Sequence, residues 1–140
     1  MILVDAGVWV ALGVAGDRHH AVARRALQDH ANERLVTSWP VITEACHLLG
    51  SRHGIDKVLE FLALVAQNGC DVFELRFEHC ARIAALMRKY RDLPMDLADA
   101  SLVVAAEALG CGTILSTDAR DFGVFRWGDR KSFKNLLPAP

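Results

Sequence analysis

Hydrophobic and polar positions follow two different periods along this chain of 140 residues. Short apolar runs at residues 2–4, 35–37 and 113–117 have the length of buried strands, and residues 71–75 alternate polar and apolar side chains as a half-buried strand does. Apolar residues spaced three and four apart predict helices between these runs, at residues 22–27, from 39 onward, at 58–65, at 80–87 and at 94–109.

One of these helices differs from the others. Between residues 94 and 109, apolar side chains cover nearly every side of the predicted helix, so we expect it to be buried centrally. Asp17 is expected to cap the helix at residues 22–27, and a last edge strand is expected at 133–137. Strands that alternate with helices predict one α/β unit with a mainly parallel sheet.

Composition and charge narrow the class of protein. Apolar residues make up 52% of the chain and charged residues 24%, which excludes intrinsic disorder. Sixteen Lys and Arg against 17 Asp and Glu give a formal charge of −1, so the chain is not a polycation. Affinity for nucleic acid must therefore come from local patches or from bound metal.

The sequence shows no pattern typical of a membrane span, a signal peptide or a Cys-x-x-Cys site. The longest uncharged run, residues 6–16, is too short to span a bilayer. Asp5 interrupts the opening apolar run and no basic residue precedes Arg18, so we expect no signal peptide and a cytoplasmic protein. The four cysteines form no Cys-x-x-Cys pair, so we interpret them as small buried apolar residues.

The acidic residues carry the chemical information. Asp5 and Asp118 each follow an apolar run at the end of a predicted strand, where open α/β sheets bind their ligands. Asp96 and Asp99 lie in the first turns of the buried helix, and Glu44 lies within a largely apolar helix. Only Asp118 among these five has a Lys or Arg within three residues, so the set calls for a hard divalent cation.

Each acid taken alone has an ordinary structural explanation. An Asp after a strand is often a turn residue or a helix cap, and Asp96 and Asp99 could simply complement a helix dipole. Glu44 could point outward from a partly exposed helix. The combination is harder to explain without a cation.

Four segments in order resemble the PIN-domain nucleases, and their spacing resembles the VapC-type toxins of bacterial and archaeal toxin–antitoxin pairs. The matching segments are Val4-Asp5 with residues 8–12 and Asp17 with residues 19–21, then Glu44, then residues 95–102 with Asp96 and Asp99, then residues 114–122 with Ser116, Asp118 and Asp121.

The resemblance implies a fold, an activity and partners. The fold would be a PIN-like three-layer sandwich, with a mainly parallel sheet of four or five strands flanked by helices in a single domain, residues 1–140. The activity would be metal-dependent endoribonuclease cleavage of RNA phosphodiester bonds by a type II toxin, with a cognate antitoxin and a homodimer as partners. One or two Mg²⁺ or Mn²⁺ ions would be held by Asp5, Glu44, Asp99 and Asp118, with Asp96, Ser116 and Asp121 in secondary roles.

The chain departs from the family pattern after the first acid. The family usually carries a hydroxyl or amide residue at one or both of the next two positions, whereas Ala6 and Gly7 stand there. That change removes a side chain able to orient the first carboxylate or a water near it. In the last segment we take Asp118 as the site residue and Asp121 as a helper or a cap.

Basic residues near the C-terminal end are candidates for RNA contact. Positive charges outnumber Asp129 four to one in this segment, at Arg126, Arg130, Lys131 and Lys134. Other basic groups, such as Arg24-Arg25, are expected to be solvated faces.

Other enzyme classes fit poorly. A haloacid-dehalogenase-type phosphatase needs a second acid where Gly7 stands, a response-regulator receiver needs a Lys-Pro pair, and no Gly-rich phosphate loop is present. Glu44 and His47 have di-iron spacing but no second such pair, so His47 is expected to be packed or at the surface. A non-cleaving RNA-binding translational inhibitor, or an inactive PIN-like partner subunit, remains the alternative, which a cleavage assay with and without metal separates.

Overall fold

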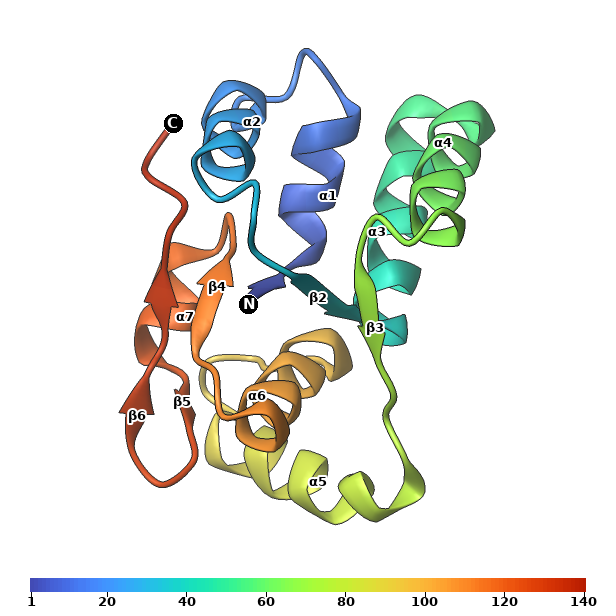
Figure 1. The fold of residues 1–140 in the computed structure, drawn as a ribbon. Coiled ribbons are helices and arrows are strands. Elements are labelled where there is room, and N and C mark those ends of the chain that lie inside the picture. The colour runs from blue at the N-terminus through green and yellow to red at the C-terminus, as the bar shows by residue number, and fades with distance from the viewer.

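A five-stranded parallel sheet forms the centre of the computed structural model, which describes residues 1–140 (Figure 1). The strand order is β3-β2-β1-β4-β7, with every neighbouring pair parallel. The strands are β1 (Ile2–Val4), β2 (Leu35–Ser38), β3 (Asp71–Phe73), β4 (Thr113–Leu115) and β7 (Lys134–Asn135). The prediction of a mainly parallel sheet of four or five strands is confirmed.

Helices cover both faces of this sheet. Figure 1 shows α1 and α2 on one side and α5 and α6 on the other, which confirms the three-layer arrangement. The helices are α1 (Ala6–Gly13), α2 (His20–Asp29), α3 (Trp39–His53), α4 (Ile55–Ala66), the 3₁₀ turn η1 (Phe77–His79), α5 (Cys80–Lys89), α6 (Leu97–Leu109) and α7 (Ala119–Val124). A short antiparallel hairpin, β5 (Arg126–Trp127) and β6 (Lys131–Ser132), follows α7.

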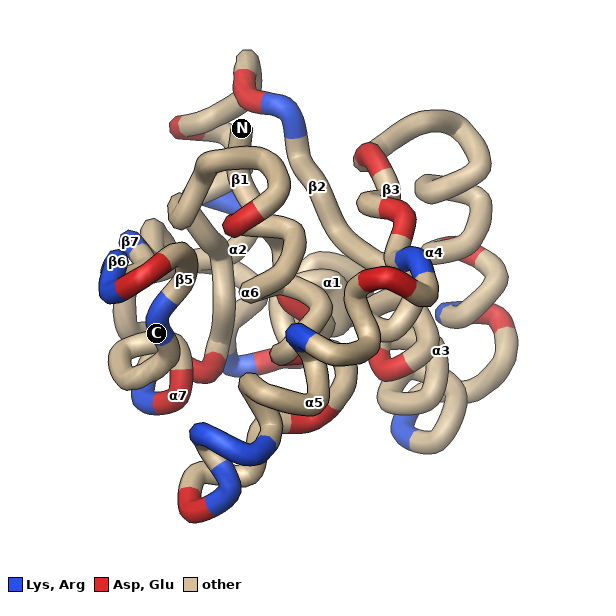
Figure 2. The backbone as a smooth tube through the Cα atoms, turned by 90° about the horizontal axis from the view of Figure 1, so that it is seen from below, with Lys and Arg blue, Asp and Glu red and all other residues tan.

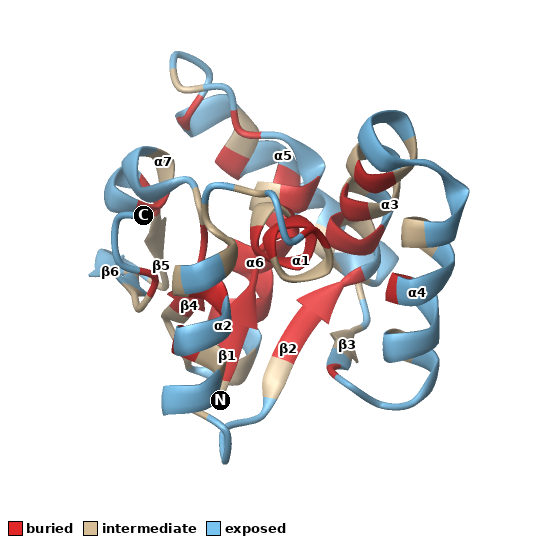
Figure 3. Cartoon of the chain, turned by 90° about the horizontal axis from the view of Figure 1, so that it is seen from above, coloured by how far each residue is buried: buried red, intermediate tan, exposed pale blue.

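Two helices lack a polar face and are buried next to the sheet (Figure 3). In α6 every residue from Ala100 to Ala106 is buried, as the apolar pattern predicts. Helix α1 is equally buried, but its uninterrupted apolar sequence carries no helical periodicity and was not predicted as a helix. In contrast, α4 is mostly exposed, with only Phe61 buried.

Some local predictions are wrong. Asp17 does not cap α2, because its carboxylate accepts the N–H of His19 and the helix begins at His20. All four cysteines are free thiols, but only Cys70 is buried; Cys46 and Cys111 are partly buried, and the interpretation as buried residues is wrong for the exposed Cys80. The predicted strand at residues 113–117 ends at Leu115, where the side chain of Asn135 takes over the pairing by accepting the N–H of Ser116.

No helix in the structure combines the length and the apolar character needed to cross a membrane.

Candidate active site

Asp5 is the central acid of the site and follows directly after β1. Its Oδ1 atom accepts the N–H of Ala6 over 2.8 Å, which caps α1, and its Oδ2 atom accepts the hydroxyl of Ser116 over 2.8 Å. Only 7% of Asp5 is exposed. Burial raises its pKa above the ordinary value, while the two hydrogen bonds favour the charged form and partly oppose that shift.

Asp118 joins Asp5 through the same serine. The Ser116 hydroxyl oxygen accepts the N–H of Asp118 over 3.0 Å, so one side chain contacts both the first and the last acid. The Asp118 carboxylate then accepts the N–H of Asp121 over 3.1 Å and caps α7. Burial first, and then the hydrogen bond with Asp118, raise the pKa of Asp121, whose helper role stays a prediction.

Asp96 and Asp99 form a reciprocal cap at the start of α6. The Asp96 carboxylate accepts the N–H of Asp99 over 2.8 Å, and the Asp99 carboxylate accepts the N–H of Asp96 over 3.3 Å. Asp96 is exposed whereas Asp99 is half-buried. Both acids therefore lie at the start of α6, as expected, and Asp99 is the more deeply buried of the two.

Mutual repulsion identifies the acids that lie close together. Burial first, and then the charges of Asp96 and Asp5, raise the pKa of Glu44 to about 7. The same causes in the same order raise the pKa of Asp99 to about 8. Asp118 adds to the repulsion at Asp5. All five acids predicted for the site thus belong to one electrostatic cluster, with Asp96 the leading charged neighbour of both Glu44 and Asp99.

A pair of buried serines fixes the two helices that carry Glu44 and Asp99. Ser38, the N-cap of α3, lies 2.6 Å from Ser101 of α6, oxygen to oxygen. The Ser101 hydroxyl lies 2.7 Å from the carbonyl of Ala98, one turn earlier in α6. Both serines are completely buried. Neither serine is predictable as a site residue from the sequence, because a buried serine pair carries no periodic signal.

The side chain missing at Gly7 is replaced from another element. A Cβ atom at Gly7 would lie 2.0 Å from the hydroxyl oxygen of Thr117, which therefore occupies the space beside the first turn of α1. Thr117 stands between Ser116 and Asp118. The departure noted at Ala6 and Gly7 thus leaves a hydroxyl group at this point, supplied by Thr117, two residues after β4.

The donor set fits a hard divalent cation. Every candidate ligand is a carboxylate oxygen, the type that Mg²⁺ and Mn²⁺ prefer, and the cluster contains no basic side chain that would compete. No group of three or more of these side chains lies close enough to form a closed ligand cage. Mg²⁺ does not require one, because it retains several waters and binds through one or two carboxylates.

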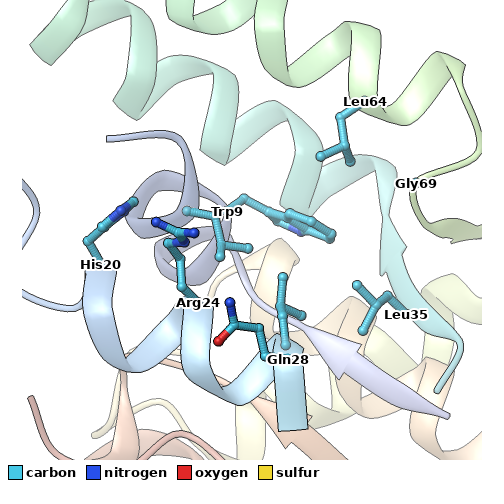
Figure 4. A pocket seen from close by; sticks show the side chains of 9 residues that line it. Trp9, His20, Arg24, Gln28, Leu35, Leu64 and Gly69 are labelled. Atoms are coloured by element: carbon cyan, nitrogen blue, oxygen red, sulfur yellow. The ribbon is translucent and has the colours of Figure 1, made fainter. Parts of the chain in front are cut away.

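A separate apolar hollow lies away from the acids, between α1, α2 and α4 (Figure 4). Its volume is about 520 Å³. Trp9 forms its floor, Arg24 and Gln28 line the α2 side, and Leu64 projects from α4. His20, at the same rim, is fixed by a contact of 2.7 Å between its Nδ1 atom and the carbonyl oxygen of Ala11. His20 is the first residue of α2.

The basic residues of the C-terminal segment lie along one edge of the molecule (Figure 2). Arg126 is not free, because its guanidinium donates to the carbonyls of Gly123, Val124 and Phe125 at the end of α7, each over 2.9 Å. Lys131 extends over the ring of Trp127. Arg130 and Lys134 are exposed. RNA contact by this segment stays a prediction, and Arg126 is its weakest member.

Comparisons with known proteins agree with this geometry. A model of the PIN domain matches residues 2–126. The chain is 28% identical over 125 residues to Ribonuclease VapC26 of Mycobacterium tuberculosis (strain ATCC 25618 / H37Rv), an alignment that covers 89% of this chain and 92% of that protein. The crystal structure of Mycobacterium tuberculosis VapC20, described as a sarcin-ricin loop cleaving toxin, matches with a TM-score of 0.77 and 23% identity over 86% of this chain and 92% of that one.

Proposed function

We propose that this chain, which belongs to the PIN domain family, is a metal-dependent endoribonuclease and the toxin of a type II toxin–antitoxin pair. One observation carries the proposal. Asp5, Glu44, Asp96, Asp99 and Asp118 come from separate parts of the sequence and form one acidic cluster without a basic partner. The names of the two similar proteins, a ribonuclease and an RNA-cleaving toxin, support RNA as the substrate.

The acidic cluster by itself would repel a phosphodiester. Asp5, Glu44, Asp99 and Asp118 would hold Mg²⁺ or Mn²⁺, with Asp96 acting through water. When bound, such a cation supplies charge neutralisation, activation of the attacking water and stabilisation of the leaving oxygen.

The chain's own residues orient the acids. Each carboxylate oxygen of Asp5 accepts one hydrogen bond, and together the two bonds fix the orientation of the carboxylate. Ser116 sets the distance between Asp5 and Asp118, and the contact between Ser38 and Ser101 fixes α3 against α6. Groups held in this way require little rearrangement when RNA binds, which lowers the barrier to reaction.

A cleavage assay tests this function directly. The purified chain is expected to cut single-stranded RNA in Mg²⁺ or Mn²⁺, to stop in EDTA and to recover when metal is restored. Asp99→Asn is expected to be inactive, whereas the matched control Asp92→Asn, an exposed acid in the loop after α5, stays active. Undiminished cleavage after complete metal removal contradicts the mechanism. Tight RNA binding without cleavage in any metal favours the non-cleaving inhibitor instead.

Two kinds of protein partner belong to the proposal. An antitoxin segment would occupy the apolar hollow above Trp9, because a concave groove accepts a helix or an extended segment of a partner. Two copies of the same concave surface do not fill each other, so a homodimer would use one of the exposed apolar side chains elsewhere, such as Ile55 and Leu59 of α4. Light scattering of the purified chain, alone and with the small protein encoded beside it, tests both.

A further inference from the structure

Trp39 is an exposed indole beside the acidic cluster. It is the first residue of α3 and is 58% exposed, whereas Trp9 is only 3% exposed and packs against Phe61. Trp127, the third tryptophan, lies under the ammonium group of Lys131. Trp39 and the exposed Leu97 line the same hollow next to acidic side chains, and an exposed apolar patch with polar residues at its rim marks a binding surface.

The indole lines a hollow that is continuous with the site. Trp39, Pro40 and Leu97 are among its apolar lining residues, Glu44 and Asp96 belong to the acidic cluster, and His47 also lines it. The hollow measures about 610 Å³, and Leu97 is 48% exposed within it. A molecule bound at Glu44 and Asp96 therefore has an open apolar surface directly beside it.

The backbone at Trp39 is rigid even though its side chain is open. Ser38 caps α3 from a completely buried position in contact with Ser101. The carbonyl of Trp39 accepts the Thr43 hydroxyl over 2.9 Å, and Pro40 restricts the residue before it. The indole is thus presented from a fixed point, which reduces the entropy lost when a ligand binds against it.

We propose that Trp39 is a stacking platform for one base of the RNA, next to the phosphodiester that the acidic cluster holds. The proposal rests on the ribonuclease function proposed above and adds to it a residue that positions the substrate. Single-stranded RNA is recognised by splaying bases out onto aromatic side chains, and every base offers a face for stacking. Leu97 and Pro40 provide the apolar surroundings that such a base needs.

A second copy of the chain is a poorer occupant of this hollow. In a two-fold symmetric contact, Glu44 and Asp96 of one copy would approach the same acids of the other, and like charges across an interface are unfavourable. An RNA strand is accompanied by cations, and these cations would lie between its phosphates and the carboxylates of the cluster.

Two substitutions and a control test the platform. Trp39→Ala is expected to raise KM for single-stranded RNA about 5- to 150-fold, the change that a stacking energy of ~1–3 kcal/mol corresponds to. Trp39→Phe keeps an aromatic ring and is expected to stay within about threefold of the unchanged chain. Phe77→Ala serves as the control, because Phe77 is 83% exposed on η1 and does not line the hollow.

An abasic scan identifies the stacked position. RNA oligonucleotides that lack one base at a time are compared on the unchanged chain and on Trp39→Ala. At the stacked position, loss of the base and loss of the indole are expected to cost no more together than either costs alone. Additive losses at every position, or an unchanged KM for Trp39→Ala, overturn the stacking platform. Normal cleavage in that case leaves the ribonuclease function intact.

Two further outcomes are distinguishable. If Trp39→Ala shifts the chain from dimer to monomer in light scattering, the indole belongs to a subunit interface and the platform is refuted. If the unchanged chain neither cuts nor binds RNA in Mg²⁺ or Mn²⁺, the ribonuclease function fails as well.

Discussion

The hydroxyl of Ser116 connects two acids that stand 113 positions apart in the sequence, Asp5 and Asp118. Ser116→Ala removes the donor to Asp5 and the acceptor for the N–H of Asp118. We expect cleavage to fall about 10- to 150-fold, because a hydrogen bond to a charged group is worth ~1.5–3 kcal/mol. Ser116→Thr keeps the hydroxyl and is expected to retain most activity. Initial rates at saturating Mn²⁺ measure both, and equal losses in the two variants would refute this role of the hydroxyl.

Repulsion in the acidic cluster predicts how the metal-free chain responds to pH. The pKa values of about 7 for Glu44 and about 8 for Asp99 lie above the ordinary values of these carboxyls, so the folded chain binds more protons than the unfolded chain between about pH 4 and pH 8. The melting temperature in EDTA is therefore expected to rise as pH falls from 8.5 to 6. Asp99→Asn is expected to flatten that rise and to melt higher at pH 8.5, whereas the control Asp92→Asn keeps it. A metal-free chain that melts lower at pH 6 than at pH 8.5 would contradict this.

The contact between Gly7 and Thr117 predicts a dependence between two substitutions. Gly7→Ser places a Cβ atom 2.0 Å from the Thr117 hydroxyl oxygen, so something must move. Overpacking of this kind costs ~1–3 kcal/mol of stability. We expect Thr117→Ala to restore most of that loss in the double variant, as measured by urea unfolding. Gly123→Ala is the matched control, because open space surrounds Gly123 in α7, and it should be neutral or stabilising. Equal stability of Gly7→Ser and the unchanged chain would contradict the prediction, because it would show that the Thr117 side chain moves aside at no cost.

Asp96 and Asp99 are expected to differ in kinetics. Asp99→Asn should remove nearly all cleavage, because Asp99 is the deeper acid of the pair. Asp96→Asn keeps the helix cap, since Asn caps as well as Asp, and should reduce the rate less while raising the Mn²⁺ concentration needed for half-maximal activity. Cleavage rate against Mn²⁺ concentration for both variants decides this. An inactive Asp96 variant beside a nearly normal Asp99 variant would reverse the two roles.

The hollow above Trp9 gives a prediction for the antitoxin. Leu64→Lys places a charge on its α4 wall, where an apolar partner segment would have to bury it. We expect the small protein encoded beside this chain to stop co-purifying with the variant, while RNA cleavage in Mg²⁺ is unchanged. Leu62→Lys, on an exposed part of α4 outside the hollow, is the control. Co-purification that survives Leu64→Lys but not Leu62→Lys would place the partner on the outer face of α4.

The fold was predictable where the periodic pattern is strong. The strands at Ile2–Val4 and Leu35–Ser38 and the buried helix at Leu97–Leu109 follow from runs and stripes of apolar residues. Helix α1 was missed because a helix buried on all sides has no polar stripe to mark its period. The hairpin of β5 and β6 was missed because strands of two residues are shorter than any pattern that sequence reveals.

The site was predictable as a set of acids but not as an arrangement. Strand ends and helix starts mark Asp5, Asp118 and Asp99 in the sequence, and the structure brings them into one cluster. The groups that orient them depend on contacts between distant segments, such as Ser38 with Ser101, and no local pattern encodes those. Trp39 was interpreted only as the start of a helix, because its exposure is a property of the folded surface.

The position of β1 also bears on when this chain becomes an enzyme. β1 is the first strand to leave the ribosome, yet one of its two neighbours in the sheet is β4, which begins at residue 113. Pairings between segments so far apart form late in folding, after most of the chain has been synthesised. Asp5 therefore cannot contact Ser116 or approach Asp118 until those residues have been synthesised. Until then the acids of the site are not in one cluster. The acidic site therefore forms only after residue 118 has left the ribosome.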